Sequence, residues 1–134
     1  MIQAHIAIFN ESFLRCQNKR GFLDRFYELF LASSKEVSDK FKNTDFEKQK
    51  MVLKSSFYMM MLAAQGNAKG QRYLEEIADL HSSRRLDIEP EMYDLWLECL
   101  IKTLREFDPL FDDKIERVWR SLMNRGIGLM KSKY

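Results

Sequence analysis

The sequence FEKQKMVLKSSFYMMMLAA, residues 46–64, repeats with the period of an α-helix. One face of that helix collects side chains spaced by three or four residues, namely Phe46, Gln49, Leu53, Phe57, Met60 and Ala64. Asn43, Thr44 and Asp45 precede the run, and their side-chain oxygens suit the N-cap of a helix. Gly66 and Asn67 follow it and favour a chain reversal. The pattern predicts a long amphipathic helix with defined ends.

Helical periods recur on both sides of this segment. Apolar residues at helical spacing predict further helices within residues 2–14, 21–31, 74–81, 90–104 and 115–130, and residues 33–40 predict a short, turn-like piece. Pro90 suits the first residue of its helix, whereas Asp108 and Pro109 interrupt the chain again. No alternating strand pattern and no internal repeat occurs. The fold class is therefore expected to be all-α, with about seven helical pieces.

Composition limits the classes of protein that the chain can be. Its 134 residues are 46% hydrophobic and 31% charged, which predicts one globular domain over residues 1–134. Basic and acidic residues number 22 and 20 and are interspersed, so we expect no nucleic-acid partner. The most apolar run, Phe57 to Ala64, is too short to span a membrane. Isolated Cys16 and Cys99 form no disulfide or metal motif, and a cytoplasmic protein is expected.

Two histidines occur, His5 and His81. His81 ends an apolar helix stripe that also contains Leu74, Ile77 and Ala78. By itself this position is better explained by a structural role, because the negative end of a helix dipole stabilises a terminal histidine. The neighbouring segments decide between that role and metal binding.

Four motifs, taken in order, resemble single-domain bacterial globins and the globin part of flavohaemoglobins. They are Arg25-Phe26-Tyr27-Glu28-Leu29-Phe30, Glu36-Val37-Ser38-Asp39-Lys40-Phe41, Gln49-Lys50-Met51-Val52-Leu53 and Ala78-Asp79-Leu80-His81. The closing Val118-Trp119-Arg120 is also similar to the last helix of that family. The resemblance covers essentially the whole chain. It implies a globin fold of three-over-three packing, with no helix between Phe41 and the helix that starts at Phe46.

The resemblance also implies a cofactor, haem b, with His81 as its iron ligand. A neutral imidazole is a good axial donor to haem iron. Tyr27 and Gln49 would face the gas ligand on the other side of the haem, and Phe41 would stack on the haem plane. Lys50 and Lys54 depart from the family pattern, so the helix register could differ, and Lys50 or Leu53 would then face the iron in place of Gln49. Tyr27 has the alternative of an ordinary interfacial tyrosine.

Further residues are expected around the cofactor. Apolar walls are predicted from Phe41, Leu53, Phe57, Ile88, Leu97 and Met123. The second ring nitrogen of His81 needs a partner, for which we expect the Ile77 carbonyl, and Tyr93 is expected beside the histidine. Arg84 or Arg85 would pair with a haem propionate, unless both lie in a solvated loop.

The function implied is reversible binding of O₂, CO or NO at ferrous iron, for oxygen binding, delivery or NO handling. Tyr27 and Gln49 can each donate a hydrogen bond to a partly anionic ligand. One alternative is NO dioxygenase activity with an external reductase, but no Asp or Glu follows Glu116 to supply the acidic partner that the flavohaemoglobin histidine has. A gas sensor or a haem-free globin-like interaction module is the other alternative. The oligomeric state is left open.

Overall fold

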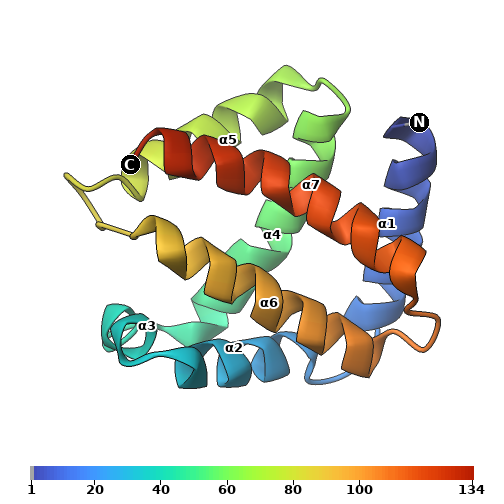
Figure 1. The fold of residues 1–134 in the computed structure, drawn as a ribbon, viewed down its shortest axis with the longest axis horizontal. Coiled ribbons are helices and arrows are strands. Elements are labelled where there is room, and N and C mark those ends of the chain that lie inside the picture. The colour runs from blue at the N-terminus through green and yellow to red at the C-terminus, as the bar shows by residue number, and fades with distance from the viewer. Residues whose placement is uncertain (1) are drawn as a thin grey trace.

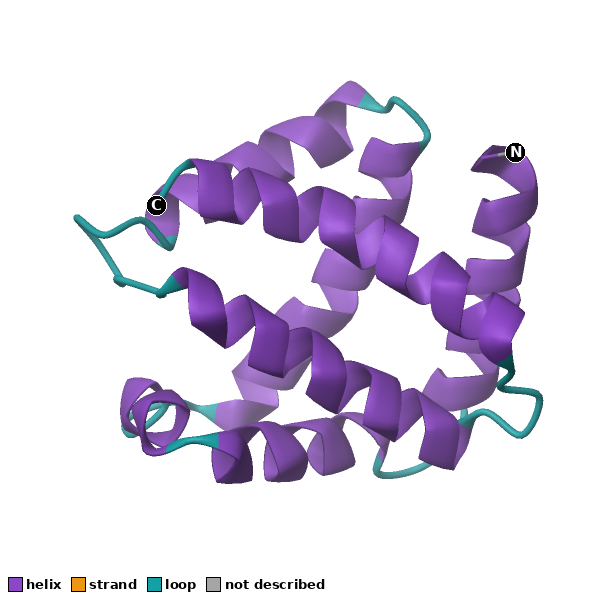
Figure 2. Ribbon diagram, viewed as in Figure 1, coloured by secondary structure: helices purple, strands orange, loops and turns teal. Residues whose placement is uncertain are grey.

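The computed structural model describes residues 2–134, which form seven α-helices and no strand (Figures 1 and 2). The helices are α1 (Ile2–Gln17), α2 (Phe22–Ser33), α3 (Lys35–Lys40), α4 (Phe46–Ala64), α5 (Ala68–Leu80), α6 (Pro90–Phe107) and α7 (Asp113–Ser132). The predicted all-α class is confirmed. The piece expected to be turn-like, residues 33–40, contains the short helix α3, which Ser34 caps by accepting a hydrogen bond from the Val37 amide.

The ends of the long helix α4 follow from its flanking residues. Asp45 caps it, with its carboxylate accepting hydrogen bonds from the amides of Glu47 at 3.1 Å and Lys48 at 3.4 Å. Gly66 has φ of 81°, a left-handed conformation that turns the chain back toward α5. Asn67 then caps α5 through the amides of Lys69 and Gly70. Because this turn is short, α4 and α5 pack directly against each other.

Gly70 makes the close approach of α4 and α5 possible. A Cβ on Gly70 would lie 2.6 Å from the Ala63 nitrogen and 2.8 Å from the Met59 oxygen, both backbone atoms of α4. Neither backbone atom can move aside as the end of a flexible side chain can. The orientation of α5, and of the histidine at its end, therefore depends on a residue without a side chain.

The remaining helices enclose the core. α6 and α7 run across the front of the view in Figure 1, with α4 behind them and α2 below α6. α2 packs on α6, and α7 contacts α1, α4, α5 and α6. Phe57 and Trp119 are fully buried, with ring centroids 5.7 Å apart, and Phe9 lies 4.4 Å from Trp119. This aromatic cluster fills the part of the interior between α1, α4 and α7.

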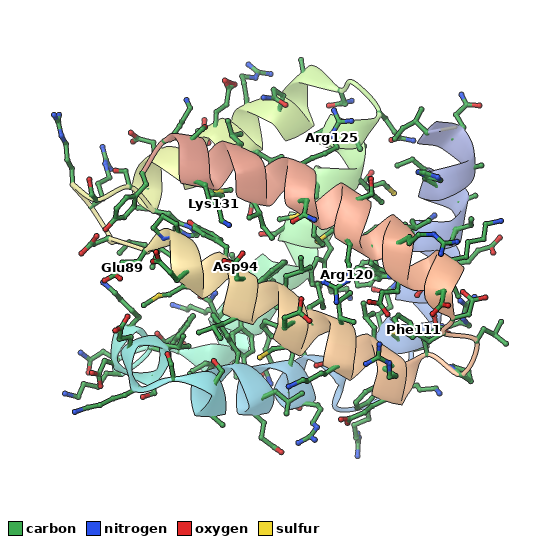
Figure 3. The ribbon with its side chains drawn as sticks, in the orientation of Figure 1. Glu89, Asp94, Phe111, Arg120, Arg125 and Lys131 are labelled. Carbon is green, nitrogen blue, oxygen red and sulfur yellow. The ribbon has the colours of Figure 1, made fainter. Side chains whose placement is uncertain are left out.

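Salt bridges on the outer surface join α6 to α7. Arg120 of α7 bonds Glu98 of α6 at 2.7 Å, and Lys131 bonds Asp94 at 2.9 Å; Figure 3 labels Arg120, Lys131 and Asp94. None of the helices within residues 2–134 combines the length and apolar composition that a bilayer crossing requires.

Candidate functional site

A cavity of about 330 Å³ lies among α2, α3, α4, α5, α6 and α7. Its size is within the range of small-molecule and cofactor sites, roughly 300–1,000 Å³. Most of its wall is apolar, and the side chains that bring polar atoms to it are Tyr27, Lys40, Thr44, Gln49, Ser56, His81 and Tyr93. A second hollow of about 360 Å³ between α1 and α4 has no imidazole or acidic side chain in its lining. The chemistry is therefore concentrated in the first cavity.

His81 stands directly after the last residue of α5, with its ring in the cavity wall. Its Nδ1 lies 3.0 Å from the Tyr93 hydroxyl of α6. Burial lowers the pKa of His81 below its usual value of 6.5, which favours the neutral ring. No described residue hydrogen-bonds Nε2, so this nitrogen is the one that can bind a metal ion.

The partner of Nδ1 differs from the sequence-based expectation. The Ile77 carbonyl accepts the backbone N–H of His81 at 2.9 Å, because α5 closes its last helical turn there. The ring nitrogen instead meets Tyr93, which α6 brings across from a position 12 residues later in the chain. Sequence spacing along one helix cannot reveal a partner that a second helix supplies.

Tyr27 is the polar group that α2 brings to the cavity. It is 5% exposed and packs edge-on against Phe26, Phe41 and Phe46. Burial raises the pKa of Tyr27 to about 12, an effect that the nearby Gln49 side chain opposes. Within residues 2–134, the Tyr27 hydroxyl makes no hydrogen bond of 3.5 Å or less. No fully buried side-chain oxygen or nitrogen in that range lacks a partner, so this hydroxyl is accessible rather than sealed in the core. A protonated phenol is therefore free to donate to a ligand in the cavity.

The register of α4 places Gln49 and Leu53 on the cavity wall, one helical turn apart. Lys50 does not line the cavity, because its ammonium group bonds Asp24 of α2 at 2.7 Å and Glu47 at 3.0 Å. The alternative in which Lys50 faces the ligand therefore does not fit the structure.

Seven of the twelve residues predicted for the site line the cavity: Tyr27, Phe41, Gln49, Leu53, His81, Ile88 and Tyr93. The other five, Phe57, Leu97, Met123, Arg84 and Arg85, do not. Phe57 and Met123 are fully buried, and Leu97 is 7% exposed, so these three pack in the protein core. Helical periodicity identifies buried residues but does not separate a cavity wall from the solid core beside it.

Arg84 and Arg85 are exposed in the loop between α5 and α6. The Arg85 guanidinium pairs with Asp79 at 3.3 Å, and the solvated-loop alternative describes both arginines. The cation that lines the cavity is Lys40, whose Nζ donates to the Leu86 carbonyl at 3.1 Å. Helical periodicity and the family resemblance do not single out Lys40 as a site residue, although it directly precedes Phe41.

Other cavity residues were also missed. They are Phe30, Thr44, Val52, Ser56, Met60, Leu86, Met92, Trp96, Ile127 and Met130. Trp96 and Ile127 lie on predicted apolar stripes, so their burial was foreseeable while their contact with the cavity was not. Ser56 carried no sequence signal; its Oγ bonds the Tyr73 hydroxyl of α5 at 2.9 Å.

Comparisons with known proteins agree with this architecture. No curated protein matches the chain. A crystal structure from Pseudomonas aeruginosa, whose protein is described as structurally highly homologous to a human hemoglobin, superposes with a TM-score of 0.92. The two sequences are 37% identical over 97% of this chain and 98% of the other. The globin family model matches residues 25–128. The chain belongs to the globin family.

Proposed function

We propose that the protein binds one haem b in this cavity through His81 and binds O₂, CO or NO reversibly at ferrous iron. The observation that supports this best is the pairing of two groups in one apolar cavity. His81 has Nδ1 held by Tyr93 and Nε2 free, and Tyr27 offers an unbonded hydroxyl. α2 carries Tyr27 and lies at the bottom of the view in Figure 1, and α5, which His81 directly follows, lies at the top.

The residues present fit haem. When bound, haem would supply an iron that takes one ligand from the protein and one gas ligand. His81 would provide the neutral nitrogen donor, and the hydrogen bond between its Nδ1 and the Tyr93 hydroxyl holds the orientation of the ring. Phe41, Leu53 and Ile88 line the cavity and would exclude water from the bound cofactor. Lys40 lines the cavity and would be better placed than Arg84 or Arg85 to pair with a propionate.

Tyr27 and Gln49 would retain a partly anionic gas ligand. A donor to a charged acceptor contributes roughly 1.5–3 kcal/mol, and Tyr27 keeps its proton at neutral pH since its pKa is raised to about 12. We therefore propose that the Tyr27 phenol slows the release of O₂ more than it slows the release of a nearly neutral ligand such as CO.

NO dioxygenase activity with an external reductase is a second candidate, and the Tyr93–His81 hydrogen bond favours it. A phenol that accepts from Nδ1 makes the imidazole a stronger donor to iron. No acidic side chain bonds His81 within residues 2–134, so this effect is smaller than a carboxylate would produce. Consumption of NO by the ferrous protein with O₂ and a generic reductase would identify the enzyme, and its absence would leave a binding protein.

An absorption spectrum of the ferrous protein with and without CO tests the proposal. Protein produced with adequate haem should be red, with a Soret band that CO shifts. His81→Ala should lose the band, whereas His5→Ala, on α1 and away from the cavity, should keep it. A wild-type protein that takes up no hemin would overturn the proposal and favour a haem-free interaction module.

We further infer that residues 1–134 act as one globin domain, and that the protein is cytoplasmic. The two cysteines, Cys16 and Cys99, are free and buried, which fits a reducing compartment. Non-reducing gel analysis of protein taken directly from cells would show no disulfide-linked species.

A further inference from the structure

The loop of residues 81–89, between α5 and α6, closes one side of the cavity. Leu86 and Ile88 line the cavity, and Asp87 between them has φ of 54°. A left-handed backbone is unfavourable for most residues, and Asp and Asn tolerate it best among those with a side chain. The loop is therefore held in a conformation that needs support from its surroundings.

Hydrogen bonds within the loop return it to the end of α5. The amide of Asp87 donates to the Ser82 carbonyl at 2.9 Å, and that of Ile88 donates to the His81 carbonyl at 3.0 Å. Because the second of these bonds reaches the backbone of His81, the position of Asp87 is coupled to the residue that we assign as the iron ligand.

Tyr134 supports the loop from outside. Its hydroxyl donates to Asp87 Oδ1 at 2.5 Å, and its carbonyl accepts from the Ser83 amide at 3.0 Å. Figure 1 shows the C-terminal end of α7 beside the end of α5. The ion pair of Lys131 with Asp94, labelled in Figure 3 together with Glu89 at the end of the loop, holds that part of α7 against α6.

The Tyr134 hydroxyl keeps its proton at ordinary pH. The hydrogen bond to Asp87 raises the pKa of Tyr134 to about 12, because a phenolate beside a carboxylate is unfavourable. The hydroxyl is therefore a permanent donor. Tyr134 is 41% exposed, so water competes for the bond and the contact can open without disrupting the core.

We propose that Tyr134 and Asp87 form a latch that holds the 81–89 loop against the cavity and slows the release of haem. This inference rests on the proposed function. Leu86 and Ile88 of the loop form part of the apolar wall of the cavity. A bound cofactor would leave the cavity past these residues when the loop opens. Tyr134 thus acts as a positioning residue, since it does not itself line the cavity.

Two measurements on Tyr134→Phe test the latch. The first is amide hydrogen exchange of residues 83–88 in the hemin-free protein, which reports loop opening whether or not haem binds. The second is the rate of hemin transfer from the loaded protein to an excess of an apoprotein acceptor. Both rates should rise by about 3- to 10-fold, as expected for loss of one partly solvated hydrogen bond.

Matched variants separate the latch from a general loss of stability. Asp87→Asn keeps an acceptor oxygen and a residue that tolerates the left-handed backbone, so it should stay near the wild type, whereas Asp87→Ala should raise both rates at least as much as Tyr134→Phe, because it loses the acceptor and also strains the backbone. Tyr58→Phe removes a hydroxyl from an exposed tyrosine of α4 and should change neither rate.

Each outcome is decisive. Unchanged amide exchange in Tyr134→Phe would overturn the latch, and faster exchange with unchanged hemin loss would overturn its control of release. A wild-type protein that binds no hemin would overturn the proposed function and the release step with it. Amide exchange would then still decide whether Tyr134 restrains the loop.

Discussion

The hydroxyl of Tyr27 is the polar side-chain group that α2 brings to the cavity. In Tyr27→Phe we expect O₂ to dissociate about 10- to 150-fold faster, because the hydrogen bond to a partly anionic ligand is lost. Dissociation of CO should change much less. Stopped-flow ligand replacement measures both rates, and Tyr58→Phe is the control for loss of an exposed hydroxyl. Equal, small effects on the two gases would contradict the role of Tyr27.

Tyr93 contacts the ring of His81, so any effect of Tyr93 on the site would act through that ring. In Tyr93→Phe the Nδ1 atom of a half-buried ring loses its partner at 3.0 Å. Loss of such an outer-shell contact typically lowers metal affinity by about 10- to 100-fold, so hemin should dissociate faster and the iron–histidine stretching band should shift. Resonance Raman spectra of the ferrous protein check the second effect. An unchanged band would show that the hydroxyl does not influence the ligand bond.

At the scale of helices, the contact between α4 and α5 depends on Gly70. We expect Gly70→Ala to lower the free energy of unfolding by about 1–3 kcal/mol, because the new methyl group would press on backbone atoms of α4. Gly128→Ala is the matched control, since a Cβ there meets open space and should stabilise α7 by up to about 1 kcal/mol. Urea unfolding of both variants compares the two directions. A neutral Gly70→Ala would mean that α5 can move away from α4 at little cost.

At the scale of the whole molecule, one buried carboxylate connects α1 to the segment between α6 and α7. Asp108 is 2% exposed and accepts hydrogen bonds from Ser12 at 2.6 Å and from Arg15 Nε at 2.6 Å. Ser12 in turn accepts the Trp119 indole N–H at 2.9 Å. The first and last helices are thereby joined by a direct hydrogen bond, and the same Ser12 hydroxyl donates to Asp108.

This network predicts an acid dependence of stability. Burial acts to raise the pKa of Asp108, but the hydrogen bonds from Arg15, Ser12 and the Leu110 amide outweigh it and hold the pKa below 3.8. Because the folded state binds the proton less readily than the unfolded chain, the contribution is present above about pH 3.8 and is lost as pH falls below that value.

Asp108→Asn tests the acid dependence. Its free energy of unfolding at pH 7 should be lower by about 2–4 kcal/mol, and the difference from the wild type should shrink below pH 3.8. Urea titrations at several pH values measure this, with Asp39→Asn as an exposed control on α3. A difference that stays constant down to pH 3 would show that the carboxylate charge does not stabilise the fold.

Local sequence determined the helices of this protein and much of their amphipathic character. The spacing of Phe46, Leu53 and Phe57, the cap residues Asp45 and Asn67 and the turn at Gly66 act within a few residues of one another, so their effects are visible without any partner segment. His81 and Tyr27, which the family resemblance singled out, both line one cavity.

Tertiary structure alone decided which buried residues face the cavity and which partners the polar groups find. Phe57 and Leu53 lie one turn apart on the same helix, yet only Leu53 borders the cavity, since the rings of Phe13 and Trp119 cover Phe57. Tyr93 reaches His81, and Tyr134 reaches Asp87, only because separate helices converge there. The pattern along one helix sets which of its residues are buried. A contact depends on the positions of two helices, and those positions result from packing of the whole chain.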